Sequence, residues 1–414
     1  MNKVYNLYSS LKFALLNNKN LYIYMLSKVF SSVIIAVTGI FIARYFSKED
    51  FGLLKTVITF LGFVSIFISF GLNDYFLIKF SKQKNNFKLI SKVLGTFSIL
   101  YFLFFPVSLI LYNFFYDKGL IFLIILYIGI LIGNISSIIN IIFQVFDKFK
   151  LLSLLTFLNA ISYLVLVYFF ISFIRGDLKD YFYILLFISF LNLFINLYFF
   201  SKISKLKYLI FRPTFNINIL RYSFPFFISG LTSFIYMQSD ILLLSILKNT
   251  EEVARYSIPV TFINASYLIP TILYNYFIPK LSMSFNSKNF KFHYKNFLKF
   301  NTFFSIPLFI ILFFFGEHLL VFLFTEKYID SLPILQMLSI VFLFHSFCFI
   351  FGGILTASNN QKIRTYIQST GAILNIILNL LFIPYFGAEG AAMTTMLTEI
   401  IIFIGYLYFG RKYI

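Results

Sequence analysis

Residues 221–247 read RYSFPFFISGLTSFIYMQSDILLLSIL, a run longer than the roughly 20 residues that a helix needs to cross a bilayer. Beyond Arg221 the run carries one charge, Asp240. A carboxylate at that depth is costly and by default marks a functional site. The small or polar positions of the run share one side of a helix, namely Ser229, Gly230, Ser233, Met237 and Asp240.

The composition is that of a membrane protein. Of the 414 residues, 60% are hydrophobic and 12% are charged, against roughly 25% charged residues in soluble domains. Apolar runs of spanning length recur from end to end, and no loop is long enough for a separate soluble domain. The segment 1–20 is polar and lacks a cleavage pattern, so we expect the first helix to be retained rather than removed as a signal peptide.

Charge and cysteine usage exclude several classes. The formal net charge is +19, but the basic residues lie in short loops between spans. The positive-inside rule explains that distribution, and nucleic acid is therefore not expected as a partner. A single cysteine, Cys348, excludes an internal disulfide and a cysteine-based metal cluster.

Hydropathy predicts an all-α polytopic fold of twelve spans. They cover residues 21–45, 52–79, 91–116, 119–146, 151–174, 181–201, 217–247, 253–280, 297–324, 331–356, 363–386 and 388–410. With the N-terminus in the cytoplasm, most of the 34 Lys and Arg fall on cytoplasmic segments. That asymmetry predicts that both termini are cytoplasmic.

The longest cytoplasmic connection, residues 202–216, divides the chain into two predicted six-helix bundles, 1–201 and 217–414. A faint internal repeat supports the division: SKEDFGLLKTVITF at 47–60 aligns with NTEEVARYSIPVTF at 249–262. Halves with six helices each have the same orientation, which predicts a pseudo-twofold axis along the membrane normal.

No enzyme motif is present, such as a P-loop or HExxH, so we expect neither catalysis nor a cofactor. The candidate functional residues are charges inside spans. Lys28 either extends to the cytoplasmic surface or faces a cavity. Asp240 and Glu399 are too deep to reach water, so both are predicted to face a cavity and to couple protons or sodium. Arg44 ends its span at the outer side as a cap, an interface anchor or a vestibule residue.

Uncharged polar residues form stripes on the last two spans. The stripe on 363–386 is Gln368, Gly371, Asn375 and Asn379, and that on 388–410 is Ala391, Thr395 and Thr398 beside Glu399. Such stripes pack helices together in lipid or line a cavity; packing is the favoured interpretation, with Asn375 kept as a cavity candidate. His345 is interpreted as a hydrogen-bonded packing residue, with a proton relay as the alternative.

Three segments carry a family resemblance. They are ARYFSKEDFGLL at 43–54, SFPFFISGLTSFIYMQSDILLLS at 223–245, and LTASNNQKIRTYIQSTGAILNIILNLLFIPYFGAEGAAMTTMLTE at 355–399. The last is the most specific, with its IPxxG loop and GAxGAA helix opening. The first segment resembles helix 1 of the polysaccharide-unit flippases (Wzx/RfbX type), the second resembles helix 7, and the third resembles helices 11 and 12. That family lies within the multidrug/oligosaccharidyl-lipid/polysaccharide exporter superfamily.

The resemblance implies two six-helix bundles around a V-shaped central cavity. It also implies alternating-access transfer of polyprenyl-pyrophosphate-linked oligosaccharides to the outer leaflet of the bacterial inner membrane, for O-antigen or capsule. Asp240 and Arg44 occupy family-pattern positions. Lys28 would face the diphosphate, with Arg44, Arg221 or Arg364 as other contacts.

Expected partners are the lipid-linked substrate, membrane lipids and the polysaccharide polymerase machinery. The alternatives are a cation-coupled antiporter of the same fold, a lipid II flippase, and a membrane polymerase or glycosyltransferase. The short loops argue against the last of these.

Overall fold

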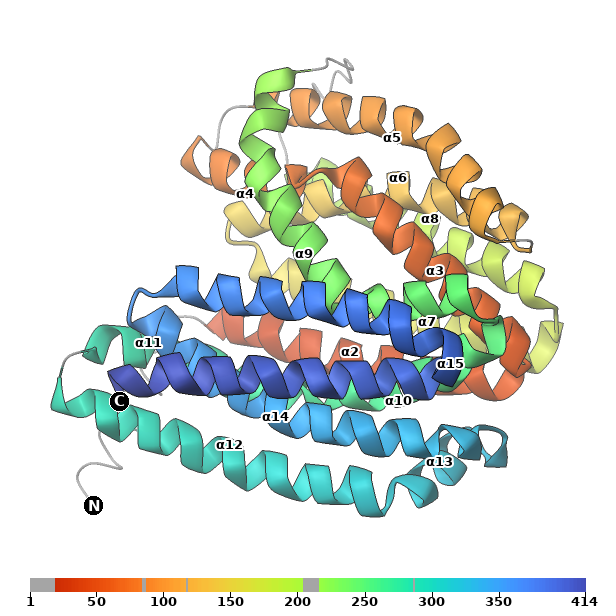
Figure 1. The fold of residues 1–414 in the computed structure, drawn as a ribbon. Helices are drawn as coiled ribbons and strands as arrows, with labels where there is room; N and C mark the ends of the chain where they lie inside the picture. The colour runs from red at the N-terminus through yellow and green to blue at the C-terminus, as the bar shows by residue number, and fades with distance from the viewer. Residues whose placement is uncertain (1–18, 84–86, 117, 204–215, 286) are drawn as a thin grey trace. The chain divides into compact units, whose positions relative to one another are not determined.

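The computed structural model describes residues 19–83, 87–116, 118–203, 216–285 and 287–414 (Figure 1). Within these residues every regular element is a helix, and eleven helices are long and apolar enough to cross a membrane. The predicted all-α polytopic fold is confirmed.

The helices are α2 (Lys19–Tyr45), α3 (Lys48–Ser69), α4 (Leu72–Lys82), α5 (Phe87–Phe115), α6 (Leu120–Val145), α7 (Phe149–Phe169), η1 (Phe170–Ile174), α8 (Leu178–Ile203), α9 (Ile217–Leu247), α10 (Thr250–Ser266), α11 (Leu268–Ser284), α12 (Lys288–Phe314), α13 (Gly316–Phe324), η2 (Glu326–Ser331), α14 (Leu332–Ala357), α15 (Gln361–Gly410) and η3 (Arg411–Tyr413).

The eleven spanning helices account for the twelve predicted spans because α15 contains the last two. Figure 1 shows α15 folding back on itself, and the residue with non-helical angles is Gly387, at φ 58° and ψ −133°. Another predicted span, 52–79, is wrong as a continuous helix, since α3 ends at Ser69 and α4 begins at Leu72. Phe70 and Gly71 between them have φ of 43° and 68°, a left-handed conformation that ends helices.

Contacts divide the described chain into two compact units. Unit 1 comprises the residues up to Phe41 and those from Phe60 to Leu231, and unit 2 comprises Ile42–Thr59 and Thr232–Ile414. Each unit therefore includes a short piece of the other sequence half. Most of the predicted 202–216 linker lies outside the described residues, so the division at that linker stays a prediction.

Helix boundaries repeat along the chain. One constant number of residues separates three pairs of helix boundaries: the ends of α2 and α9, the starts of α3 and α10, and the ends of α4 and α11. The same offset aligns 47–60 with 249–262. The aligned segments also start their helices alike. The Ser47 hydroxyl accepts a hydrogen bond from the Asp50 backbone nitrogen at 3.0 Å, and the Asn249 side chain accepts one from the Glu252 nitrogen at 3.0 Å. The sequence repeat is thus a repeated N-cap.

After α12 the spacing lengthens. Both ends of α6 and α14, and the starts of α7 and α15, share a second and larger constant offset. The offset increases where α13 and η2 lie between α12 and α14. In the described part of the first half, the corresponding connection between α5 and α6 contains no helix. The second half is therefore a copy of the first with a short helical insertion.

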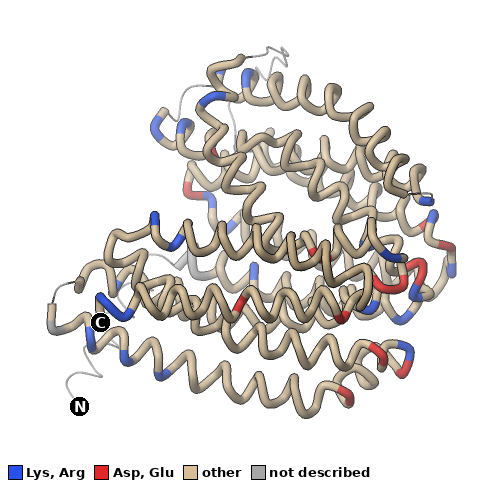
Figure 2. The backbone as a smooth tube through the Cα atoms, viewed as in Figure 1, with Lys and Arg blue, Asp and Glu red and all other residues tan. Residues whose placement is uncertain are grey.

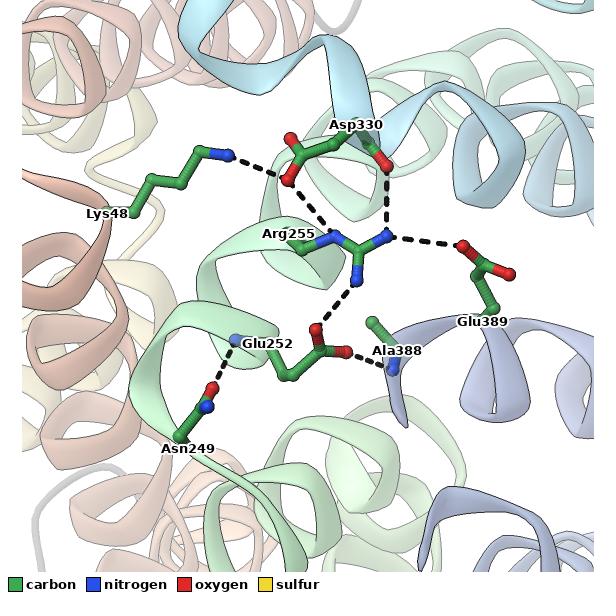
Figure 3. Close-up of polar contacts among 7 residues, drawn as sticks. All are labelled: Lys48, Asn249, Glu252, Arg255, Asp330, Ala388 and Glu389. Carbon is green, nitrogen blue, oxygen red and sulfur yellow. Dashed lines mark hydrogen bonds and ion pairs between the residues drawn. The ribbon is translucent and has the colours of Figure 1, made fainter. Parts of the chain in front are cut away.

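One end of unit 2 is held by an ion-pair network centred on Arg255 of α10 (Figure 3). Its guanidinium nitrogens lie 2.7 Å from Glu252, 3.3 Å from Asp330 and 3.2 Å from Glu389. Lys48 of α3 pairs with Asp330 at 2.7 Å. The network connects α3, α10, η2 and the second leg of α15, where Figure 2 shows acidic positions gathered.

Glu252 also explains the glycine at the reversal of α15. Its Oε2 accepts a hydrogen bond from the Ala388 backbone nitrogen at 2.6 Å, so the carboxylate caps the second leg of α15. A Cβ atom on Gly387 would lie 2.3 Å from that same oxygen. Space and the positive φ both require glycine here.

We expect Gly387→Ala to destabilise the protein by about 1–3 kcal/mol, the range for a non-glycine residue held in a disfavoured conformation. The measurement is thermal unfolding of the purified protein in detergent. The matched control is Gly133→Ala on α6, where an added Cβ meets nothing within 4 Å. Equal melting temperatures for the two variants would contradict the role of Gly387.

Candidate functional site

Asp240, in the last third of α9, is buried, with 8% of its surface exposed. Its carboxylate accepts hydrogen bonds from the Tyr256 hydroxyl at 2.5 Å, the Asn379 amide at 2.6 Å and the Thr395 hydroxyl at 2.8 Å. All three donors are neutral, and none of the ion pairs in the described chain includes Asp240. The carboxylate is therefore solvated by dipoles alone, which leaves a charge there unneutralised.

More amides and hydroxyls surround these donors. The side-chain oxygen of Asn375 accepts from Ser239 at 3.2 Å and from Asn379 at 2.9 Å, while its nitrogen donates to Thr395 at 3.3 Å. The polar stripes predicted on the last two spans thus meet around Asp240. They meet because α15 reverses and brings its two legs against α9.

The second buried acid, Glu399, has different partners. Its Oε2 accepts from the Tyr236 hydroxyl at 2.5 Å, and its Oε1 lies 2.9 Å from Nδ1 of His345. The Tyr236 hydroxyl is also 3.1 Å from that nitrogen, and the imidazole packs against the ring of Tyr267 at 4.7 Å between centroids. His345 is hydrogen-bonded, as predicted, and its partner is an acid.

Both acids line one cavity. It measures about 70 Å³, and its wall also includes Tyr256, Asn375 and His345. A water molecule needs on the order of 10–15 Å³ of such volume, so the cavity has room for a small hydrated ion. A second cavity, of about 50 Å³, is lined by both Glu399 and Arg364.

The arrangement suits a small cation or a proton. Hard cations prefer carboxylate, amide and hydroxyl oxygens, and the Asp240 network offers all three kinds. The described residues contain no group of three or more His, Cys, Asp or Glu that could hold a metal. A cation in this cavity would therefore be held by at most two carboxylates, with neutral oxygens beside them.

The first half builds the same helices without this network. At the two offsets that relate the halves, Asp240, Tyr256, Asn375 and Asn379 correspond to Thr38, Leu54, Tyr163 and Val167. Thr38 is buried and donates to a carbonyl of its own helix at 2.8 Å. The fold does not require a buried acid at this position, so the acid in the second half serves another purpose.

Arg44 does not belong to the Asp240 network. Its Nε donates to the carbonyl of Leu323 at 2.7 Å, near the end of α13. In return, Lys327 after α13 donates to the carbonyl of Ala43 at 3.1 Å, near the end of α2. Arg44 of α2 therefore binds a carbonyl near the end of α13, and Lys327 of η2 binds one near the end of α2.

The other basic candidates are distributed over both units. Lys28 is exposed on α2 in unit 1, with its Nζ 4.8 Å from the centroid of the Tyr24 ring. Arg221 is exposed on α9. Arg364 donates to the Tyr274 hydroxyl at 2.9 Å. Of the five site residues predicted from sequence, Asp240, Asn375 and Glu399 come together in unit 2, Arg44 of the same unit does not join them, and Lys28 belongs to unit 1.

Tyr236 and Tyr256 were not predicted from the sequence, although they donate the shortest hydrogen bonds to the two acids. A signal for both existed, because a tyrosine hydroxyl buried in a membrane helix needs a partner. With 29 tyrosines in the chain, that signal alone could not single them out.

The fold matches solved transporters over nearly the whole chain. The lipid II flippase MurJ in an inward closed conformation aligns with a TM-score of 0.77 and 19% identity, covering 94% of this chain and 87% of that one. An inward-facing multidrug resistance MATE transporter of the MOP superfamily gives 0.69 and 13%, covering 92% and 94%. At these identities the likeness establishes the fold, including its two-bundle class.

Two membrane proteins of Methanocaldococcus jannaschii, both described as uncharacterized, are related in sequence. MJ1068 is 37% identical over 106 residues, which are 26% of this chain and 21% of that protein. MJ1375 is 25% identical over 190 residues, covering 46% and 45%. The chain thus aligns with less than half the length of either relative.

Tyr256→Phe should destabilise the protein by about 1.5–3 kcal/mol, because it removes a hydrogen bond to a buried carboxylate. In an Asp240→Asn background the loss should be smaller, since the neutral amide needs the hydroxyl less. Thermal unfolding of the four proteins of this double-mutant cycle measures the difference. The same loss in both backgrounds would show that the hydroxyl does not act on the charge.

Two family models match the sequence. Residues 225–381 match the MatE model, and residues 18–285, more than half of the chain, match the model described as polysaccharide biosynthesis protein. The predicted resemblance is confirmed at the level of the family: the chain belongs to the polysaccharide biosynthesis protein family.

Proposed function

We propose that this chain moves polyprenyl-pyrophosphate-linked oligosaccharides from the cytoplasmic to the outer leaflet of the plasma (inner) membrane. The product would supply a surface polysaccharide such as O-antigen or capsule. Membership in a polysaccharide biosynthesis family supports the saccharide, and a fold shared with a lipid II flippase supports a lipid carrier. In this proposal the chain is a transporter rather than an enzyme, and both termini are cytoplasmic.

The observation that carries the proposed mechanism is the Asp240 carboxylate, buried among neutral donors in a cavity that Glu399 also lines. A proton or sodium ion bound there neutralises the charge. Its binding also changes the hydrogen bonds that tie α9 to α10 and to both legs of α15. Ion occupancy is thereby coupled to helix packing, as alternating access requires. Each charge that crosses the membrane supplies about 2.3 kcal/mol per 100 mV.

The substrate's diphosphate requires cations, and its sugars require hydrogen-bonding groups. Lys28, exposed on α2, is the proposed cation, and Arg221 and Arg364 are further candidates. Arg44 is a weaker candidate because its guanidinium already binds carbonyls of α13. The proposed partners are the lipid-linked oligosaccharide, the surrounding membrane lipids and a polymerase that consumes the flipped unit.

A cation-coupled multidrug or metabolite antiporter is the second candidate. The MatE match covers residues 225–381, the region that contains Asp240 and Asn375. Two acids in one cavity would also attract an organic cation. A lipid II flippase is the third candidate, on the fold shared with MurJ.

Deletion of the gene separates these candidates. Loss of surface polysaccharide, with lipid-linked units accumulating at the inner leaflet and unchanged resistance to cationic dyes, is the result expected for the proposed flippase. Intact polysaccharide with new dye sensitivity would indicate the antiporter. Accumulation of lipid II instead would indicate the third candidate.

Asp240→Asn should abolish export in that strain, because the amide cannot exchange a proton or balance a sodium ion. Membrane insertion should be unchanged, since the first half folds without an acid at the equivalent position. Glu399→Gln should reduce export as well. The control is Asp74→Asn, which removes an exposed acid at the start of α4. Full export by both Asp240→Asn and Glu399→Gln would end the coupling hypothesis.

A further inference from the structure

A basic pocket lies in unit 1, where α4 ends and α5 and α9 begin. It measures about 210 Å³ and is lined by Lys79, Lys88 and Lys92, with Tyr75, Leu89, Asn216, Asn218, Ile219 and Tyr222. Figure 2 shows Lys and Arg positions gathered around these helix ends. Three lysines thus line one small pocket, and none of its lining residues is an acid.

This arrangement is unfavourable without a ligand. Lys88 and Lys92 are four residues apart on α5 and repel each other across one turn. Lys88 also lies in the first turn of α5, where the positive end of the helix dipole disfavours a cation. An anion in the pocket would remove both penalties.

The backbone adds to the positive potential. Two helices, α5 and α9, begin at the pocket wall, and the start of a helix carries a partial positive charge. At the start of α9, the side-chain oxygen of Asn216 accepts a hydrogen bond from the backbone nitrogen of Asn218 at 3.0 Å. The backbone nitrogens of Ile219 and Leu220 donate to the carbonyl of Asn216 at 3.0 Å and 3.4 Å, so this end of α9 contributes its dipole to the pocket.

Two tyrosines complete the wall. The rings of Tyr75 and Tyr222 lie nearly parallel, at 8° and with 6.3 Å between centroids. Tyrosine and tryptophan are the residues typical of membrane interfaces, and this chain has no tryptophan. The pocket therefore has the surroundings of a lipid head group rather than of a soluble ion.

We infer that this pocket binds the phosphate or diphosphate group of a membrane lipid. Lys79, Lys88 and Lys92 balance its charge, and the dipoles of α5 and α9 add to the positive potential. Basic pockets between membrane helices are known to bind lipid phosphates in this way. The lipid is either an anionic phospholipid or a polyprenyl diphosphate carrier. Only the second source rests on the proposed function.

The positive-inside rule accounts for lysines at this side of the membrane, but it does not require them to converge on one pocket. A charge-matched control separates the two explanations. The test variant is Lys79→Gln/Lys88→Gln/Lys92→Gln. The control is Lys150→Gln/Lys295→Gln/Lys299→Gln, which removes three exposed lysines on α7 and α12 that do not line the pocket. A third variant, Lys79→Arg/Lys88→Arg/Lys92→Arg, keeps the charge.

The full chain, reconstituted in phosphatidylcholine nanodiscs, is titrated with polyprenyl diphosphate or with phosphatidylglycerol, and bound lipid is counted by native mass spectrometry. The test variant should bind on the order of 100-fold more weakly, at about 1 kcal/mol per lysine. The control and the arginine variant should bind like the wild type. Each protein's melting temperature confirms that it is folded.

Selective loss of polyprenyl diphosphate binding identifies the carrier lipid as the ligand, and selective loss of phosphatidylglycerol binding identifies a phospholipid. Equal binding by test variant and control, or equal weakening of both, overturns the inference. Failure of the proposed function would appear separately, as normal polysaccharide export in the deletion strain, and would leave the phospholipid arm intact.

Discussion

The arrangement of unit 2 depends on the hydrogen bonds that solvate the buried carboxylate of Asp240, which forms no ion pair with another described residue. Asp240 receives one hydrogen bond from α10 and one from each leg of α15. Each of these helices must therefore keep its rotation and height relative to α9. A hydrogen bond to a charge is stronger than a neutral one, and the low dielectric of the interior strengthens it further. The same interactions that position the helices are the ones that a bound cation would disturb.

The end of unit 2 solves the same electrostatic problem differently. There Arg255 pairs with three acids, and Lys48 shares one of them. These residues are partly exposed, with side-chain exposures of 20–39%, so charges of both signs can be neutralised by each other. In the buried middle, Asp240 has only neutral donors, while Glu399 has a histidine that carries charge only when protonated. Permanent ion pairs hold the end together, and adjustable contacts hold the middle.

The two halves of the chain share one helical plan but differ at the positions of the buried acid network. Two copies of one helical plan begin their second helices with the same N-cap and keep a constant offset over their first helices. The first copy packs Thr38 and Leu54 where the second places Asp240 and Tyr256. The first copy is equally helical without these residues, so the fold does not require the acid network. A buried acid is energetically costly, which indicates a functional role rather than a stabilising one.

The sequence by itself determined the helical class, most of the helix boundaries, the repeat, and the candidacy of Asp240, Asn375 and Glu399. It could do so because hydropathy, caps and charge inside a span are local properties. It could not find the break at Phe70–Gly71, since the apolar run continues through it. The sequence also could not identify the hydrogen-bond partners of the two acids. Tyr256 lies 16 residues from Asp240, and Asn379 lies 139 residues away. The first distance is closed by the turn between α9 and α10, and the second by the first leg of α15, which lies against α9. The reversal at Gly387 then brings Thr395 of the second leg to the same carboxylate. Likewise, the sequence left Arg44 with several roles, and only the tertiary fold set its guanidinium on the carbonyls of α13. Which polar groups meet is decided by helix packing, which depends on residues far apart in the chain.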